Sequence, residues 1–529
     1  MATKKMSKVM RGAWILSLGG LVAKILSAVY RVPFQNMVGD TGFYAYQQIY
    51  PLYGIGMTFA LSGFPVYVSK QVAQARDPLA QTEVAHRALV LMTWIGLGMF
   101  AVLELGADLI ARAMADAGLA PIIRSVGLMF LTMPVLSTAR GYFQGTFDMS
   151  KTAISQVVEQ LIRVGVILLA AWYAVQQAWG PYKMATWAMT GAFFGGVGAT
   201  LIVLPAYLKA TAGRRAKPTP WREYGHLLDR FVKEGGSIAL FSALLILLQL
   251  VDSFTVTRGL IAQGMVPEAA RALKGVYDRG QPLVQLGLVV ATSLSTTLLP
   301  SLSRSVARGH WAAFKQTARQ LIRFNFGLSL AAAAGLIALM PNVNRLLFGD
   351  TVLTGTLRVY TLCIVLVALI NAFNAVLQSL NRFRYTSYGL VAGLVVKVLA
   401  NPFLTVRYGA FGAAVATVLS LAVITVLLYI QLPHSLQGVD PRWFNLRLML
   451  VVGPMSEAVH LVAVHMQPQN RVETLWVFIV AVPLGVVLFV ILGAIFHLYT
   501  VREVLAIPYG RKFMKWWQHR FGKDTHAIR

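Results

Sequence analysis

The sequence predicts an all-α integral membrane protein with fourteen transmembrane helices. Of the 529 residues, 57% are hydrophobic and only 13% are charged, and the apolar residues gather in long runs. A soluble domain carries about 25% charged residues, and a membrane span needs about 20 apolar ones. These values exclude a soluble enzyme. The single cysteine, Cys363, excludes an intrachain disulfide.

The first apolar run follows a basic N-terminus and covers residues 12–30. A signal peptide would need a short apolar run and a small-residue cleavage site. This run contains Lys24 and reaches Tyr30 without an A-x-A-like end, so we expect a retained first span. The fourteen predicted spans cover 12–30, 46–69, 88–111, 122–146, 153–176, 184–208, 235–258, 280–303, 324–346, 354–380, 385–406, 409–431, 444–466 and 473–499.

The distribution of Lys and Arg predicts the orientation of these spans. By these bounds, the N-terminus, the even-to-odd loops and the C-terminal tail carry 30 of the 47 basic residues, the odd-to-even loops carry eight, and nine lie within spans. Because positive charge is retained on the cytoplasmic side, we expect both termini in the cytoplasm. The net charge of +27 could also indicate nucleic-acid binding. Basic loops flanked by spans favour contact with membrane lipids instead.

An internal repeat predicts two lobes. An offset of 234 residues aligns Arg140–Gly165 with Asn374–Leu399, and the Gly-Ala-Phe at Gly191 recurs at Gly409. Each copy has six spans, so the copies are parallel repeats, as in transporters that rock one lobe against the other. We therefore predict an N-terminal lobe at 1–208, a basic linker at 209–234, a C-terminal lobe at 235–432, two further spans at 433–500 and a basic cytoplasmic tail at 501–529.

Charged residues within the spans should face a partner or a cavity, because a charge at a helix centre costs about 2.5–3.5 kcal/mol. Glu159 and Arg163 have the i,i+4 spacing of a self-neutralising pair. Lys397 shares a helix face with Asn401 and lacks an acid in its own span, so we expect it to pair with Asp252. Its ammonium would then fill a place where a sodium-coupled relative could bind a cation.

Basic residues in the first and eighth spans predict an anionic substrate. Lys24 and Arg31 lie seven residues apart and therefore on one helix face, and Arg279 opens the eighth span beside Asp278. We expect Lys24, Arg31 and Arg279 to face a central cavity. The alternative is that Arg31 only reaches toward an interface and that Asp278 only holds Arg279 in place. A cation-drug exporter would instead need a surplus of carboxylates.

Motifs of enzyme chemistry are absent from the sequence. It contains no G-x-x-x-x-G-K-[ST], no H-E-x-x-H and no Cys/His cluster with metal-ligand spacing. We therefore expect a non-enzymatic protein without a metal or cofactor. Its energy source would be the membrane potential, an ion gradient or the substrate's own gradient.

Two motifs resemble a known family. Tyr277-Asp278-Arg279, followed by the residues at 298–305, resembles the eighth span of MurJ-type lipid II flippases. The Gly-Asp-Thr-Gly-Phe-Tyr at 39–44 resembles the first outer loop of polysaccharide exporters in the same superfamily. The chain is most similar to the YtgP/SpoVB-like branch of the multidrug/oligosaccharidyl-lipid/polysaccharide flippases.

The resemblance implies translocation of an undecaprenyl-diphosphate-linked peptidoglycan precursor across the bacterial cell membrane. It implies that the basic residues of spans 1 and 8 face the cavity and that spans 13 and 14 form a groove for the lipid tail. The chain departs from the family at residues 53–56, where MurJ has a basic residue. The alternatives are a flippase for another lipid-linked glycan, such as a capsule, teichoic or O-unit precursor, an ion-coupled multidrug antiporter, and a scaffold of a cell-wall synthesis complex.

Overall fold

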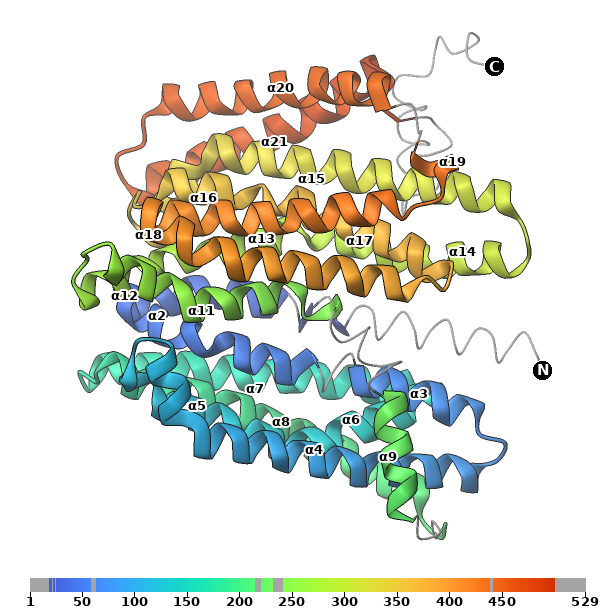
Figure 1. Cartoon of the computed structure of the whole chain (residues 1–529). Helices are drawn as coiled ribbons and strands as arrows, with labels where there is room; N and C mark the ends of the chain where they lie inside the picture. Colours follow the sequence, from blue (N-terminus) through green and yellow to red (C-terminus); the bar gives the residue numbers. More distant parts are fainter. Residues whose placement is uncertain are drawn as a thin grey trace. The chain divides into compact units, whose positions relative to one another are not determined.

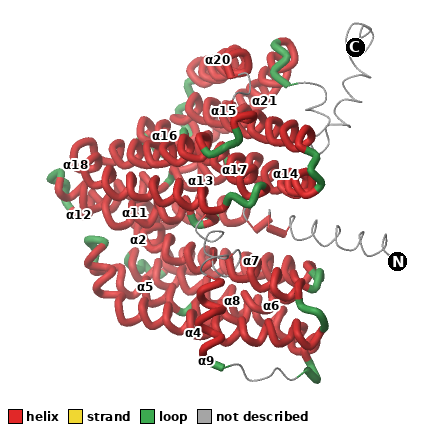
Figure 2. Tube along the Cα trace, turned by 45° about the vertical axis from the view of Figure 1, so that its right-hand side comes forward, coloured by secondary structure: helices red, strands yellow, loops and turns green. Residues whose placement is uncertain are grey.

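The computed structural model describes residues 19–499 except 21, 24, 59–62, 215–219, 232–240 and 438–440. The described part is helical and contains no strand (Figure 2). Its helices are α2 Arg31–Thr58, α3 Phe64–Gln74, α4 Pro78–Ala113, η2 Ala117–Leu119, α5 Ala120–Gly127, α6 Met129–Gly145, α7 Met149–Gln176, α8 Pro181–Thr211, α9 Trp221–Arg230, α11 Leu244–Ala262, α12 Pro267–Asp278, α13 Gly280–Gly287, α14 Val289–Ala307, α15 Trp311–Phe348, α16 Thr354–Thr361, α17 Cys363–Ser379, α18 Phe383–Ile430, α19 His434–Gln437, α20 Pro441–Met466 and α21 Arg471–Ile495 (Figure 1).

The all-α membrane architecture is confirmed. Among the described residues, ten helical segments are long and apolar enough to cross a membrane, or eleven if the bent pair Pro267–Gly287 and Ala291–Ala307 is one span. The count of fourteen stays a prediction. Three features explain the difference: α18 covers two predicted spans in one element, α2 is not among the ten, and part of the first predicted span, 12–30, lies outside the described residues. Buried polar residues such as Gln47 and Gln48 make α2 less apolar than a lipid-facing helix.

Helix α2 bends sharply at Gly39, whose φ of 70° is readily adopted only by glycine. The residues on either side of the bend contact each other in antiparallel order. The rings of Phe34 and Phe43 lie 6.4 Å apart, and the hydroxyls of Tyr30 and Tyr46 lie 2.9 Å apart. The bend thus folds the end of the first predicted span back along the second.

Helix α18 bends in the same way at Gly409, where φ is 61°. Lys397 Nζ lies 2.5 Å from Thr417 Oγ1, and Ser420 donates to the carbonyl of Gly393 at 2.5 Å. Between these two contacts, the position in the second arm rises from Thr417 to Ser420 while the position in the first arm falls from Lys397 to Gly393. This is the contact pattern of an antiparallel hairpin. Predicted spans 11 and 12 are therefore the two arms of α18.

The predicted repeat has a counterpart in the contacts of its two basic residues. Lys397 Nζ lies 3.3 Å from the carbonyl of Ala413. Arg163 lies against Gly195, since a Cβ built at Gly195 would be 3.4 Å from the Cβ of Arg163. The offset of 218 that brings Gly191 to Gly409 also brings Gly195 to Ala413. Each basic residue thus packs against the corresponding position of the next arm or helix.

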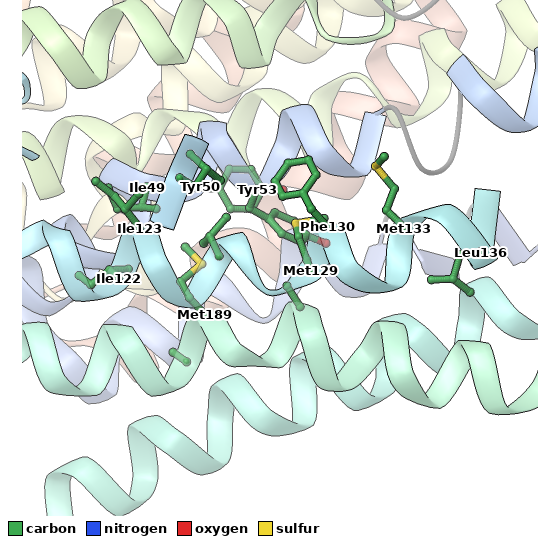
Figure 3. Close-up of a cluster of buried hydrophobic side chains, with 14 of the residues drawn as sticks. Ile49, Tyr50, Tyr53, Ile122, Ile123, Met129, Phe130, Met133, Leu136 and Met189 are labelled. Atoms are coloured by element: carbon green, nitrogen blue, oxygen red, sulfur yellow. The ribbon is translucent and has the colours of Figure 1, made fainter. Parts of the chain in front are cut away.

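The chain divides into two compact units that cut across the predicted lobes, so the lobe boundaries stay a prediction. The first unit comprises 1–286, 355–363 and 383–424, and the second comprises 287–354, 364–382 and 425–529. The first unit holds a large apolar core in which Tyr50 and Tyr53 of α2 lie beside Met129 and Phe130 of α6 (Figure 3). This core fixes one face of α2, the helix that carries most of the site described next.

Candidate functional site

Six basic side chains of the first compact unit are buried, each exposing 2% or less of its surface among the described residues. They are Arg31, Arg140, Arg163, Lys274, Arg279 and Lys397. A buried charge is stable only if a carboxylate, hydrogen bonds or a bound counter-ion compensates for its lost hydration. A buried basic residue with a compensating partner is therefore expected to stabilise the fold. A buried basic residue without one is a candidate for binding an anionic ligand.

Lys397 is compensated by the acid that the sequence predicted. Its Nζ lies 2.6 Å from Asp252 Oδ1, 2.5 Å from Thr417 Oγ1 and 3.0 Å from Asn401 Oδ1. Tyr277 donates to the second Asp252 oxygen at 3.2 Å. The lysine ammonium therefore sits inside a set of oxygen atoms that could otherwise surround a metal cation. Among the described residues, no group of three or more His, Cys, Asp and Glu could hold a metal.

Asp278 and Arg279 do not pair with each other, so the alternative that Asp278 only holds Arg279 in place is wrong. Asp278 accepts from Lys274 Nζ at 2.6 and 2.7 Å, one helical turn earlier on α12. Arg279 donates to Asp40 Oδ1 at 2.6 Å, and this links α12 to the bend of α2. The helices approach closely here, because a Cβ at Gly275 would overlap the carbonyl of Asp40. Lys274 was not among the predicted site residues, although its i,i+4 spacing to Asp278 signals the pair.

Glu159 pairs with a different arginine from the expected one. Arg140 of α6 donates to Glu159 Oε2 at 2.7 Å and to Ser155 at 3.0 Å. The expected partner, Arg163, donates instead to Gln160 at 2.7 Å. Helix α6 packs beside α7 and brings Arg140 to the carboxylate. An i,i+4 spacing allows an ion pair but does not exclude a better-placed partner on a neighbouring helix.

Arg163 faces the aromatic side of α2. Its Cζ lies 4.7 Å from the ring centroid of Tyr53 and 5.5 Å from that of Tyr30, and one of its nitrogens donates to Ser27 at 3.1 Å. Two of its guanidinium nitrogens, Nε and Nη1, have no hydrogen-bond partner among the described residues. Cation–π contacts stabilise the charge only partly, by about 0.5–2 kcal/mol each.

Arg31 is the least compensated of the six. It is completely buried, and none of its three guanidinium nitrogens has a hydrogen-bond partner among the described residues. Its Cζ lies 4.3 Å from the ring centroid of Tyr50. Arg31 and Arg163 thus share one group of buried tyrosines, the tyrosine cluster, which comprises Tyr30, Tyr46, Tyr50 and Tyr53. Within the part of the chain that the structure describes, no carboxylate pairs with either arginine.

The tyrosine cluster was not predicted. The spacing of Tyr46, Tyr50 and Tyr53 is the signal that could have revealed it, since residues four and three apart share a helix face. Lys24, the other predicted cation of the first span, lies outside the described residues. Of the predicted substrate residues, the structure therefore leaves Arg31 uncompensated and pairs Arg279 with Asp40.

A second carboxylate joins three helices of the first unit. Asp116 is buried, accepts from Tyr44 at 3.1 Å and from Tyr182 at 2.7 Å, and forms an ion pair with Arg271 at 3.2 Å. These partners lie on α2, α8 and α12. The Asp116 cluster, like the Arg279–Asp40 pair, ties α12 to helices of the predicted N-terminal lobe.

Comparisons with known proteins match almost the whole chain. A family model described as "Polysaccharide biosynthesis protein" matches residues 9–306. The uncharacterised membrane protein YabM of Bacillus subtilis is 33% identical, over 97% of both chains. The lipid II flippase MurJ of the same species is 28% identical over 80% of this chain and 82% of its own. A solved structure of lipid II flippase MurJ in an inward closed conformation superimposes with a TM-score of 0.70 at 12% identity, covering 91% of this chain and 98% of that one.

Proposed function

The chain belongs to the polysaccharide biosynthesis protein family, and we propose that it is a flippase for an anionic lipid-linked glycan. Its substrate would be an undecaprenyl-diphosphate-linked cell-wall precursor of the lipid II type. Such a headgroup cannot cross about 30 Å of hydrocarbon unaided, because its charges and sugars would lose their hydration. Alternating access of two lobes would move the headgroup while the polyprenyl tail stays in lipid.

The lack of a carboxylate partner for Arg31 and Arg163 among the described residues carries this proposal. Burying a guanidinium group without a counter-ion is unfavourable, so the arrangement is expected of a protein whose counter-ion is its substrate. Arginine binds phosphate oxygens in pairs through its planar donors, and these bonds are strong because both groups are charged. The tyrosine hydroxyls beside the two arginines could donate further hydrogen bonds to a diphosphate or a sugar.

Arg279 and Lys24 complete the proposed substrate contacts. Arg279 is bound to Asp40 at 2.6 Å, so the diphosphate would have to replace one carboxylate oxygen. This exchange would couple substrate binding to the contact between α12 and the bend of α2. Lys24 keeps the role that the sequence predicted for it, as a second cation of the first span.

Complementation tests the proposal. The chain is expressed in a bacterium depleted of its own lipid II flippase, and growth is measured alongside the amount of protein in the membrane. We expect wild-type protein to restore growth, and Lys24→Ala, Arg31→Gln and Arg279→Ala to fail at equal membrane levels. Arg124→Gln is the matched control, because Arg124 is a solvent-accessible arginine bound to Asp108 at 2.7 Å. Full growth with all three variants would refute the cationic site.

A flippase for another lipid-linked glycan is the second candidate, because the same arginines would bind any polyprenyl diphosphate. Restored capsule or teichoic acid synthesis without restored peptidoglycan synthesis would favour it. Increased drug resistance in an efflux-deficient strain, without either rescue, would identify a multidrug antiporter instead. Membership of a cell-wall synthesis complex is part of the same proposal and would be checked by co-purification with the synthases.

A further inference from the structure

Helix α20 of the second compact unit has one packed face and one open face. Leu448, Val452 and Met455 belong to the apolar core that α20 forms with α15 and α21, and α20 lies beside α21 in Figure 1. The opposite face of α20 carries a stripe of residues that are exposed, except for one that is half-buried. This stripe, the α20 seam, comprises Leu446, Leu450, Gly453, Glu457, His460 and Val464.

The spacing of the α20 seam is typical of a helix that packs along another helix. Its residues follow one another at intervals of four, three, four, three and four positions. This period of 3.5 residues keeps two helices in contact over their whole length when they cross at a small angle. The core face of α20 already contacts α15 and α21, so the seam is available to a further helix.

Glu457 is the residue of the seam that most needs a partner. The segment Trp443–Met466 is long and apolar enough to cross a membrane, and Glu457 lies fourteen residues after its start. This is about 21 Å along the helix and therefore inside the hydrocarbon. Glu457 is exposed, and among the described residues it forms no ion pair or hydrogen bond. Because a carboxyl group in lipid loses its hydration, we expect its partner to come from another molecule.

The neighbours of Glu457 in the seam indicate what that molecule is. Gly453, one turn earlier, is exposed, and a Cβ built on it would meet no atom within 4 Å. A small residue at such a position lets the backbones of two membrane helices approach closely. His460, one turn later, has ring nitrogens that can donate to a carboxylate. An acid, a base and a position of close approach thus follow one another, and the seam is complementary to a second copy of itself.

We propose that the α20 seam is the contact surface of a homodimer in the membrane. Every copy inserts with the same orientation, so a twofold axis along the membrane normal places two α20 helices parallel and brings their seams together. Glu457 then bonds to His460 of the partner subunit. The twofold axis repeats this contact, so the dimer contains it twice. The dimer does not depend on which substrate the protein carries.

Association of the full-length protein in liposomes tests the proposal. Copies that carry a donor or an acceptor fluorescent protein at the C-terminus are reconstituted together, and energy transfer is measured as the protein-to-lipid ratio is lowered. We expect Glu457→Leu to raise the dissociation constant about tenfold, because two hydrogen bonds between membrane helices are lost. Exchanging the two residues, as Glu457→His with His460→Glu, should restore much of the association, because the seam stays complementary to itself.

Gly453→Leu tests the close approach without removing a charge. It should also weaken association at least about tenfold, since the leucine would separate the two helices. It should leave the melting temperature of the dilute protein unchanged, because the glycine faces away from the rest of its own chain. If the Glu457 variants do not reach the membrane, this variant alone decides the outcome.

Gly98→Leu is the matched control. Gly98 is also an exposed glycine in a helix long and apolar enough to cross a membrane, α4, and a Cβ built on it would also meet no atom within 4 Å. It lies in the first compact unit, outside the α20 seam. Association of Gly98→Leu should therefore equal that of the wild type.

Three results would overturn the proposal. Energy transfer no greater than that of non-interacting copies would show that the wild-type protein is a monomer. Unchanged dissociation constants for Glu457→Leu and Gly453→Leu would place the contact between copies elsewhere. Loss of complementation by Glu457→Leu without any change in association would assign the seam to a lipid ligand, such as the polyprenyl tail of the substrate.

Discussion

Lys397 Nζ lies 2.6 Å from an Asp252 carboxylate oxygen, and the two side chains expose only 0% and 2% of their surface. The pair joins the first arm of α18 to α11. Asn401 extends the contact, because its amide nitrogen donates to the same Asp252 oxygen at 3.0 Å. The lysine ammonium thus occupies a site lined by oxygen atoms. Its occupancy should affect both the free energy of unfolding and the response of the protein to sodium.

Removing one member of this pair should be much more damaging than removing both. Asp252→Asn or Lys397→Met alone leaves a buried charge without its partner, and we expect a loss of about 3–5 kcal/mol in the free energy of unfolding. The double variant should recover much of that loss. Thermal unfolding in detergent measures all three, and additive damage in the double variant would contradict a direct interaction.

Sodium should not stabilise the wild-type protein, because the lysine ammonium already occupies the oxygen-lined site. Replacing sodium by choline should leave the melting temperature of wild-type protein unchanged. In Lys397→Met, the vacated site keeps the Asp252 carboxylate, so sodium should raise the melting temperature. A sodium-dependent wild type would show that a cation binds in addition to the lysine.

Glu159 should be coupled to Arg140 more strongly than to Arg163. A double-mutant cycle with Glu159→Gln and Arg140→Met removes the 2.7 Å contact, and we expect a coupling energy of about 1–3 kcal/mol. The cycle that combines Glu159→Gln with Arg163→Met should give a smaller value. A larger coupling in the second cycle would restore the i,i+4 pair that the sequence suggested.

Arg31 should lower the thermal stability of the protein although transport requires it. Replacing a buried, uncompensated charge by an apolar side chain is often neutral or stabilising, by about 1–4 kcal/mol, so Arg31→Met should unfold at an equal or higher temperature than wild type. The same variant should fail to complement flippase depletion. A strongly destabilised Arg31→Met would indicate a structural role for the arginine.

The basic segment 209–233 should be accessible from the cytoplasm. A protease added to inside-out vesicles should cut it, while intact cells should be protected, because the distribution of basic residues predicts cytoplasmic termini. Immunoblotting for the two fragments measures the cut. Cleavage in intact cells would reverse the predicted orientation.

The sequence alone determined the class of architecture, because the length of the apolar runs and the scarcity of charge leave only a helical membrane protein. It also identified the Lys397–Asp252 pair, since a lysine in the middle of an apolar span needs an acid and few acids are available. The position of Lys397 and of Asp252 along their spans further limited which acid could be the partner. The apolar runs are local features of the sequence, and the pair follows from the small number of acids within the spans. Neither inference requires knowledge of how the helices pack.

Only the tertiary structure decided the partners of the other buried charges. Glu159 had an arginine at helical spacing, yet Arg140 reached it from α6. Asp278 lay beside Arg279 in sequence, yet it pairs with Lys274, while Arg279 pairs with Asp40. The same packing left Arg31 without a carboxylate and surrounded it with tyrosines. An ion pair forms only when its charged atoms lie about 3 Å apart. The rotation of each helix and its distance from its neighbours therefore decide which charges meet, and the spacing of residues along the sequence does not specify either of them.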